Sequence, residues 1–144
     1  MEIEFEDIHL AILAVTALLI LYADHEGFSY LRGTRELLSL KKTKSLHYGV
    51  WAGLVGMIAT GIVLFWPERA YFVSEPEFLI KMCMVFALVV NAVLIGTLSK
   101  ISATIPFAQL PQKTKRLLFI SGGVSTLGWV GAAIIGFFFL YVIF

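Results

Sequence analysis

The sequence has few of the residues that mark several common classes of protein. Its 144 residues include one cysteine and four prolines, and only 15% are charged. A single cysteine excludes a disulfide scaffold, and the scarcity of proline and charge excludes a disordered tail. Soluble domains carry about 25% charged residues, so this composition excludes an ordinary soluble globule. The net charge of +1 gives no electrostatic basis for binding nucleic acid.

Short motifs of soluble enzymes and metal sites are also missing. The chain contains no GxGxxG, Walker or GxSxG sequence, and no CxxC, HxxxH or HExxH spacing. Hydrolytic and nucleotide chemistry are therefore not predicted, and Cys83 is expected to be a small buried side chain. Apolar residues are abundant instead: they make up 59% of the chain, and the mean hydropathy is +0.89. The sequence predicts a small integral membrane protein.

Four charge-free stretches indicate four membrane spans. They cover residues 8–23, 45–67, 82–99 and 117–144. A helix needs about 20 mostly apolar residues to cross roughly 30 Å of hydrocarbon, and the shorter stretches reach that length by extending into their flanks. No stretch alternates polar and apolar residues as the strands of a membrane barrel do. The prediction is an all-α, antiparallel four-helix bundle forming a single membrane domain over residues 1–144, with helices at about 5–31, 43–66, 77–103 and 114–143.

The charges separate by loop. Nine of the eleven basic residues lie between the first and second spans or between the third and fourth: Arg32, Arg35, Lys41, Lys42, Lys44, Lys100, Lys113, Lys115 and Arg116. Basic loops are retained on the cytoplasmic side, so both termini are predicted to lie outside. The expected location is the cell membrane of a prokaryote, as a multi-pass protein. Four aromatic residues are predicted to form an outer interfacial belt: Trp66, Tyr71, Phe72 and Tyr141.

Two spans carry stripes of small residues at helical spacing. One contains Gly49, Gly53, Gly56 and Thr60, and the other contains Ser121, Ser125, Gly128, Ala132 and Gly136. Small residues let membrane helices approach closely, so the stripes predict helix contacts. The alternative is that one stripe leaves room for a flat cofactor or a lipid tail.

Several polar residues fall inside the spans, where insertion of a charge costs about 2.5–3.5 kcal/mol at the helix centre. Helical phase places His9, Thr16 and Asp24 on one face of the first span. Asp24 is predicted to be buried in the bundle, with a partner on the second or third span, either His47 or Asn91. His25, Glu26 and His47 fit interfacial positions.

His9 and Lys81 begin the first and third spans, so antiparallel order places them on the same side of the bundle at matching depth. Neutral imidazole is a good ligand for haem iron, zinc or copper. If both residues ligated one iron from opposite sides, their side-chain nitrogens would be about 4 Å apart. The alternative is that Lys81 reaches outer headgroups and pairs with Glu77, one turn earlier.

Nearly the whole chain resembles an uncharacterised group of small bacterial four-helix membrane proteins. The similarity includes "HYGVWAGLVGMIATGIVLFWP" in the second span, "FLIKMCMVFALVVNAVL" in the third and "ISGGVSTLGWVGAAIIG" in the fourth. More distantly, a histidine at the start of span one and a lysine at the start of span three are similar to the membrane protoporphyrinogen oxidase (HemJ) type and to CopD-like proteins. That resemblance implies binding of haem b through His9 and Lys81. The chain departs from the oxidase pattern after Tyr22, where Ala23 and Asp24 follow, and at Asn91.

Three classes of function are consistent with these features. The first is a membrane protein that binds haem b or a porphyrin for redox chemistry, with His9 as the iron ligand and Lys81 as a second cofactor contact. The second is a proton- or cation-conducting transporter or channel subunit that uses His9, Thr16 and Asp24 as a relay. The third is a structural subunit that packs in a homo-oligomer or a larger membrane complex. The expected partner in every case is the lipid bilayer.

Overall fold

The computed structural model describes the backbone of residues 4–143 and the side chains of residues 4–139. Its elements are α1 (Phe5–Leu31), α2 (Leu40–Phe65), α3 (Arg69–Ser74), α4 (Pro76–Thr104), the 3-10 turn η1 (Phe107–Gln109) and α5 (Gln112–Ile143). Within residues 4–143 there is no strand. The predicted all-α four-helix bundle is confirmed.

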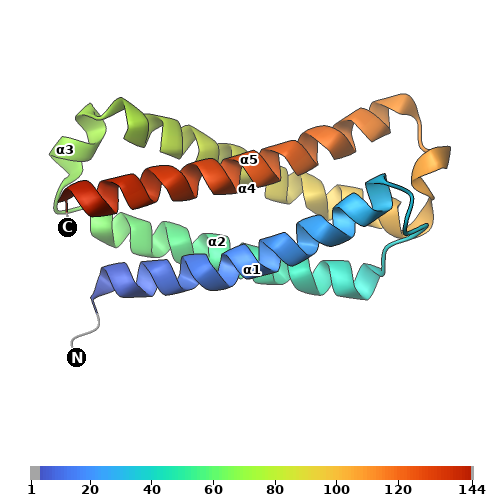
Figure 1. The fold of residues 1–144 in the computed structure, drawn as a ribbon, viewed down its shortest axis with the longest axis horizontal. Coiled ribbons are helices and arrows are strands. Elements are labelled where there is room, and N and C mark those ends of the chain that lie inside the picture. The colour runs from blue at the N-terminus through green and yellow to red at the C-terminus, as the bar shows by residue number, and fades with distance from the viewer. Residues whose placement is uncertain (1–3, 144) are drawn as a thin grey trace.

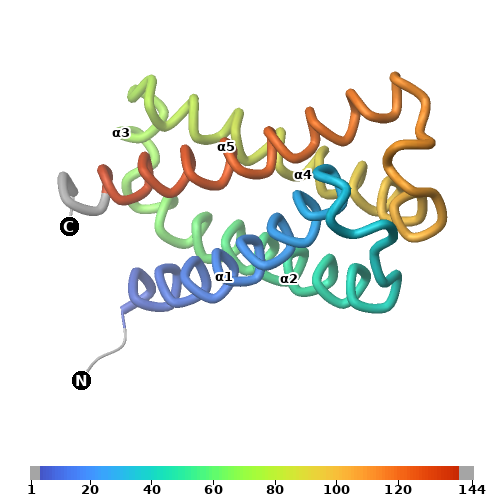
Figure 2. The backbone as a smooth tube through the Cα atoms, turned by 45° about the vertical axis from the view of Figure 1, so that its right-hand side comes forward, coloured from blue at the N-terminus to red at the C-terminus, as the bar shows by residue number. Residues whose placement is uncertain are grey.

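The four long helices run antiparallel and form an elongated bundle (Figures 1 and 2). α1 packs mainly against α2, and α4 packs mainly against α5; smaller contacts join α2 to α4 and α1 to α5. The helices therefore follow each other around the bundle in the order α1, α2, α4, α5, with α1 and α4 diagonally opposite. The start of α1, the end of α5 and the short helix α3 lie at one end, and the α1–α2 and α4–α5 connections lie at the other (Figure 1).

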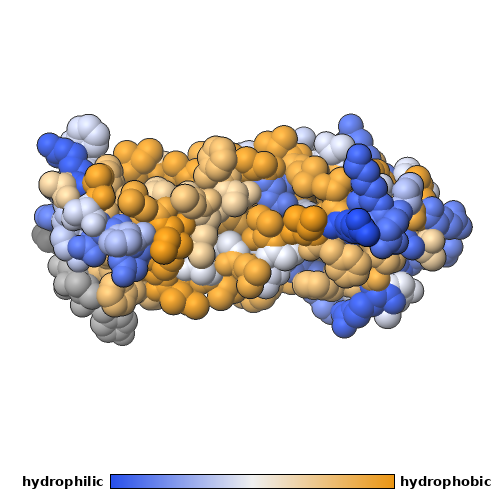
Figure 3. Space-filling model, turned by 90° about the horizontal axis from the view of Figure 1, so that it is seen from above, coloured by the Kyte–Doolittle hydropathy of each residue, from blue (hydrophilic) through white to orange (hydrophobic). Residues whose placement is uncertain are grey.

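The two ends differ in charge. We call the end with α3 the acidic end, because it carries Glu4, Glu6, Asp7, Glu68, Glu75 and Glu77. The opposite end carries the nine basic loop residues and is called the basic end. Hydrophilic residues gather at both ends, and a predominantly hydrophobic surface lies between them (Figure 3).

All four long helices are long and apolar enough to cross a membrane. Large apolar side chains point outward along their middles, such as Leu18, Phe86 and Leu127, which are about 70% exposed (69%, 70% and 73%). In water this surface would be unfavourable, whereas in a bilayer it contacts acyl chains. The chain is an integral, multi-pass membrane protein.

Local signals explain where the helices begin and end. The Asp7 carboxylate accepts a hydrogen bond from the Glu4 N–H at the start of α1, and α1 ends before Gly33, whose φ of 75° suits glycine. Ser39 caps α2 by accepting from the Lys42 N–H. Pro76 occupies the first turn of α4, where its missing N–H costs no hydrogen bond.

The stripe of small residues on α2 forms its contact with α1. A methyl group added at Gly49 would lie 3.1 Å from the Leu19 side chain, and one at Gly56 would lie 3.4 Å from Ile12. A methyl group at Gly53 would overlap Thr16, which is only 1% exposed. The prediction that this stripe is a helix contact is confirmed. We call the line of Gly49, Gly53 and Gly56 the glycine seam.

Some local expectations were wrong. α2 begins at Leu40, three residues before the predicted start at residue 43, because Ser39 caps it. Phe72 is not part of an interfacial belt: α3 directs it inward, where it packs with Phe65, Phe78 and Phe139. Trp66 and Tyr71 are exposed near the acidic end, and the Tyr141 side chain lies outside the described residues. Cys83 is exposed and not buried.

Candidate functional site

The bundle encloses two cavities that share no lining residue. The larger one, about 520 Å³, lies toward the acidic end between all four long helices and is called the acidic-end cavity. The smaller one, about 170 Å³, lies toward the basic end and is called the basic-end cavity. Cavities that hold small molecules and cofactors measure about 300–1,000 Å³, so only the acidic-end cavity falls in that range.

The acidic-end cavity has apolar walls and few polar groups. Leu54 from α2 and Leu88 from α4 line it near the middle of the bundle, and both are almost fully buried. The aromatic rings of Phe65, Phe72 and Phe78 line it near the acidic end. The ionisable residues on its walls are Glu6, His9 and Lys81. A lining of this kind, apolar with a few polar groups, is typical of a site for an organic ligand.

His9 is held in position by Thr60 on the neighbouring helix α2. Its Nδ1 lies 2.6 Å from the Thr60 hydroxyl, which donates its own proton to the Gly56 carbonyl oxygen at 2.8 Å. With the single Thr60 proton directed to Gly56, this contact suits the His9 tautomer that carries its proton on Nδ1. The Nε2 atom is then the unprotonated ring nitrogen. A histidine ordered this way on a cavity wall is prepared to act as a metal ligand through Nε2.

Lys81 enters the same cavity from the diagonal helix, α4. Its Nζ lies beside α5, 3.2 Å from where a β-carbon would be on Gly136, so the absent side chain of Gly136 makes room for it. The alternative pairing of Lys81 with Glu77 is not present: among residues 4–139, the ion pairs are those of Glu26 with Arg35 and Lys42. The structure therefore brings His9 and Lys81, far apart in sequence, to one cavity.

The second stripe of small residues, on α5, has two roles. At Gly128 a methyl group would lie 2.8 Å from Leu88, so this part of the stripe is a contact with α4. Nearer the acidic end, Ala132 and Gly136 line the cavity. The prediction of a helix contact is confirmed for the part around Gly128, and the part around Gly136 borders open space in the bundle.

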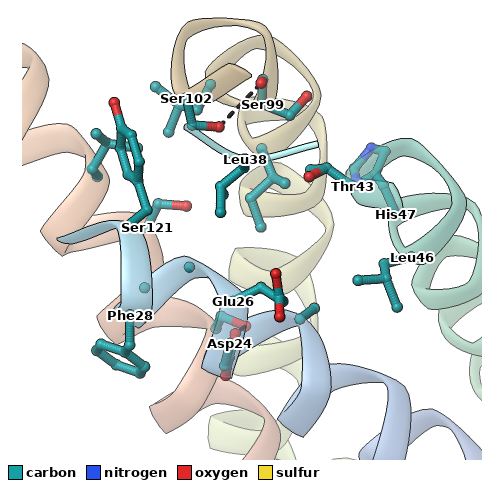
Figure 4. A pocket seen from close by; sticks show the side chains of 18 of the residues that line it. Asp24, Glu26, Phe28, Leu38, Thr43, Leu46, His47, Ser99, Ser102 and Ser121 are labelled. Atoms are coloured by element: carbon teal, nitrogen blue, oxygen red, sulfur yellow. Dashed lines mark hydrogen bonds between the residues drawn. The ribbon is translucent and has the colours of Figure 1, made fainter. Parts of the chain in front are cut away.

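Asp24 lies at the basic-end cavity, with residues from all four long helices around it (Figure 4). Its two carboxylate oxygens accept hydrogen bonds from the hydroxyls of Ser125 and Thr126, both at 3.2 Å. The expected partner on the second or third span was wrong, because α1 contacts α5 at this depth and the donors come from the fourth span. Asp24 was predicted to be buried and is half-buried, with its hydrogen bonds coming from the neutral groups of α5.

His47 and Asn91 have other neighbours. The His47 Nε2 accepts from the Trp51 indole N–H at 3.0 Å and faces Gly96 of α4. The Asn91 amide donates to the Ser121 carbonyl oxygen at 3.0 Å and links α4 to α5 in the interior. Neither residue contacts Asp24.

The residues of the predicted relay are separated. Thr16 donates to the Ile12 carbonyl oxygen on its own helix and packs against the glycine seam. His9 lines the acidic-end cavity and Asp24 lines the basic-end cavity. One helical face thus contacts two different neighbours, α2 through His9 and Thr16 and α5 through Asp24.

Glu26 has a role that sequence analysis missed. It is buried at the basic end (9% exposed), where Arg35 lies 2.7 Å and Lys42 3.4 Å from its carboxylate (Figure 4 shows Glu26 at the cavity). This carboxylate ties the α1–α2 connection and the first turn of α2 to α1. The signal in the sequence was an acidic residue just before the basic loop. His25, its neighbour, is exposed.

Among the residues that the structure describes, there is no group of three or more His, Cys, Asp or Glu side chains suited to hold a metal ion. Comparisons with family models, with curated proteins and with solved structures give no match to this chain. The residues of the acidic-end cavity are therefore the basis for a functional proposal.

Proposed function

We propose that this membrane protein binds haem b, or a closely related porphyrin, in the acidic-end cavity. His9 would hold the iron through Nε2, and Lys81 would be a second contact to the cofactor. When bound, such a group supplies one-electron redox chemistry. The observation that carries the proposal is the ordered imidazole of His9 on the wall of an apolar cavity of about 520 Å³.

The donor set suits a macrocycle better than a bare ion. A porphyrin provides four nitrogen ligands itself, so the protein needs to supply only an axial ligand. The hydrogen bond from His9 Nδ1 to Thr60 fixes both the tautomer and the ring orientation, as partners of metal-bound histidines do.

The walls suit a flat apolar group. Gly61 of α2 and Ala132 and Gly136 of α5 are small residues that line the cavity from two helices, and Trp129 adds an aromatic surface. The apolar lining would also exclude water from the ring, which is one of the means by which proteins tune a haem potential.

The test is an absorption spectrum of the full chain, expressed with haem supplied and purified in mild detergent. We expect a sharp Soret band. His9→Ala should weaken haem affinity at least tenfold, because the axial ligand is lost. Thr60→Val should weaken it about 10- to 100-fold, the usual effect of removing the hydrogen-bond partner of a metal-bound histidine.

The matched control is His47→Ala, which removes another half-buried histidine of the same bundle at the other cavity. This variant should keep the wild-type spectrum and affinity. Colourless wild-type protein after haem is supplied, or equal loss in the His9 and His47 variants, would contradict the proposal.

A further inference from the structure

We infer that the ligand of the acidic-end cavity is a lipid-soluble amphiphile with a carboxylate group, and that Lys81 binds this carboxylate. The inference deepens the proposed function and rests on it for the position of the ligand, but it does not require iron. It assigns to Lys81 the role of an anion-binding residue, with the apolar body of the ligand on the leucine, methionine and aromatic side chains around it.

The first observation is that the charge of Lys81 is uncompensated. Lys81 is half-buried within a membrane-spanning helix, and its Nζ lies against Gly136 in an apolar cavity. No hydrogen bond or ion pair joins it to another residue in the part of the chain that the structure describes. Ionisable groups inside membrane proteins normally pair with one another or mark a ligand pathway, so an anionic ligand group is the missing partner.

The second observation concerns the other ionisable groups of the cavity. Glu6 lines it one turn before His9, nearer the end of the bundle, and forms no ion pair with Lys81. The Nδ1–H of His9 is already bonded to Thr60. Lys81 is therefore the cationic group within the cavity that is free to bind a ligand anion.

The third observation is that the cavity reaches the lipid-facing surface. Ile58 and Ile62 of α2 and Met82 of α4 line it, yet they are 36%, 56% and 39% exposed. α2 and α4 are neighbouring helices, and side chains on both are shared between the cavity and the outer surface, so we place the route for the ligand between them. In a bilayer this route faces acyl chains, and the molecules that reach it are those dissolved in the lipid.

The experiment compares two brominated probes of equal length in vesicles, dibromostearate and dibromostearyl alcohol. Bromine quenches tryptophan on contact, and Trp129 lines the cavity. The full chain carries Trp51→Phe and Trp66→Phe so that Trp129 is the remaining fluorophore. We expect the acid to quench Trp129 at a concentration at least tenfold lower than the alcohol.

Three lysine variants test the cause of this preference. Lys81→Met should remove the difference between acid and alcohol, and Lys81→Arg should retain it because the positive charge remains. Lys100→Met is the matched control, since Lys100 is an exposed lysine at the far end of the same helix and should leave the preference unchanged.

Equal quenching by both probes in the wild type, quenching by neither, or a preference that survives in Lys81→Met would overturn the inference. The assay contains no porphyrin and no iron. A missing Soret band with an intact preference for the acid would therefore remove the haem proposal alone, and a Soret band without the preference would remove the anion site alone.

Discussion

Thr16 and Gly53 lie at a close approach of α1 and α2. The Thr16 side chain occupies the space above Gly53, and its hydroxyl is already bonded within α1 to the Ile12 carbonyl oxygen at 2.6 Å. The two branches on its β-carbon restrict the rotamers of Thr16, and the hydrogen bond to Ile12 holds one of them, so the side chain has little freedom to move away. The contact depends on the absence of a side chain at position 53.

We expect Gly53→Ala to destabilise the folded bundle by about 1–3 kcal/mol, because the added methyl group overpacks against Thr16. The measurement is the unfolding midpoint of the purified protein in detergent. Gly122→Ala is the control: nothing lies within 4 Å of its added methyl group, and alanine favours the helix there. Similar midpoints for the two variants would show that the glycine seam does not require glycine at position 53.

The sequence predicted the helix face on which a residue lies more easily than the residue that it contacts. Helical phase placed His9, Thr16 and Asp24 on one face of the first span, and that face lies against neighbouring helices. Phase did not identify the partners of Asp24, because it gives a direction around one helix and not the neighbour that lies in that direction. The neighbours follow from the order of helices around the bundle, which no local pattern in the chain contains. Whether His9 and Lys81 bind a cofactor remains a prediction.

At the scale of elements, the end of α1 is fixed to the α4–α5 connection. The Tyr30 hydroxyl donates to the Ile105 carbonyl oxygen at 2.6 Å, and Tyr30 is 1% exposed. Its ring packs edge-on against Phe107 of η1, and Leu38 and Leu110 belong to the same buried cluster. This cluster closes the basic end of the bundle beside the smaller cavity.

Tyr30→Phe keeps the ring and removes the hydrogen bond. We expect a loss of about 0.5–1.5 kcal/mol in the free energy of unfolding, the usual net value of one such bond. Denaturant unfolding in detergent measures it. Tyr48→Phe makes the same chemical change at a side chain that is 71% exposed, and it should shift stability by less than about 0.5 kcal/mol. A shift in Tyr48→Phe as large as that in Tyr30→Phe would argue against the contribution of this bond.

The spans themselves were predictable because hydropathy reports directly on contact with lipid. Helix α1 has the predicted bounds. Helices α4 and α5, which are the third and fourth spans, agree with the predicted bounds within one or two residues. The short helix α3 was missed because its six residues are too few to show a period. In the sequence, nothing separates Phe72, which points inward, from its exposed neighbour Tyr71, because both are aromatic residues just after the second span. The difference follows from the tertiary packing of Phe72 in the aromatic cluster at the acidic end.

At the scale of the whole molecule, the charges of the two ends point to an orientation. The start of α1 and the end of α5 lie together at the acidic end, and the nine basic loop residues lie at the other (Figure 1). We propose that the basic end faces the cytoplasm, because basic residues are retained there during insertion. Both termini would then be outside.

Reporter fusions test this orientation. In a bacterial inner membrane, alkaline phosphatase fused to the C-terminus should be active, and a fluorescent reporter that folds only in the cytoplasm should be dark. Inserted after Gly33, in the α1–α2 connection, the two reporters should give the reverse result. A fluorescent C-terminal fusion would contradict the proposed orientation.

The arrangement of helix contacts also has a consequence for biogenesis. The two largest interfaces join helices that are consecutive spans, α1 with α2 and α4 with α5, so each hairpin can complete its own packing soon after it is synthesised. Such local pairing favours rapid folding. The acidic-end cavity lies between the hairpins, where α1 meets α5 and α2 meets α4. A ligand bound there would stabilise the docking of two preassembled halves, and its supply would set how much of the newly made protein reaches the closed four-helix state.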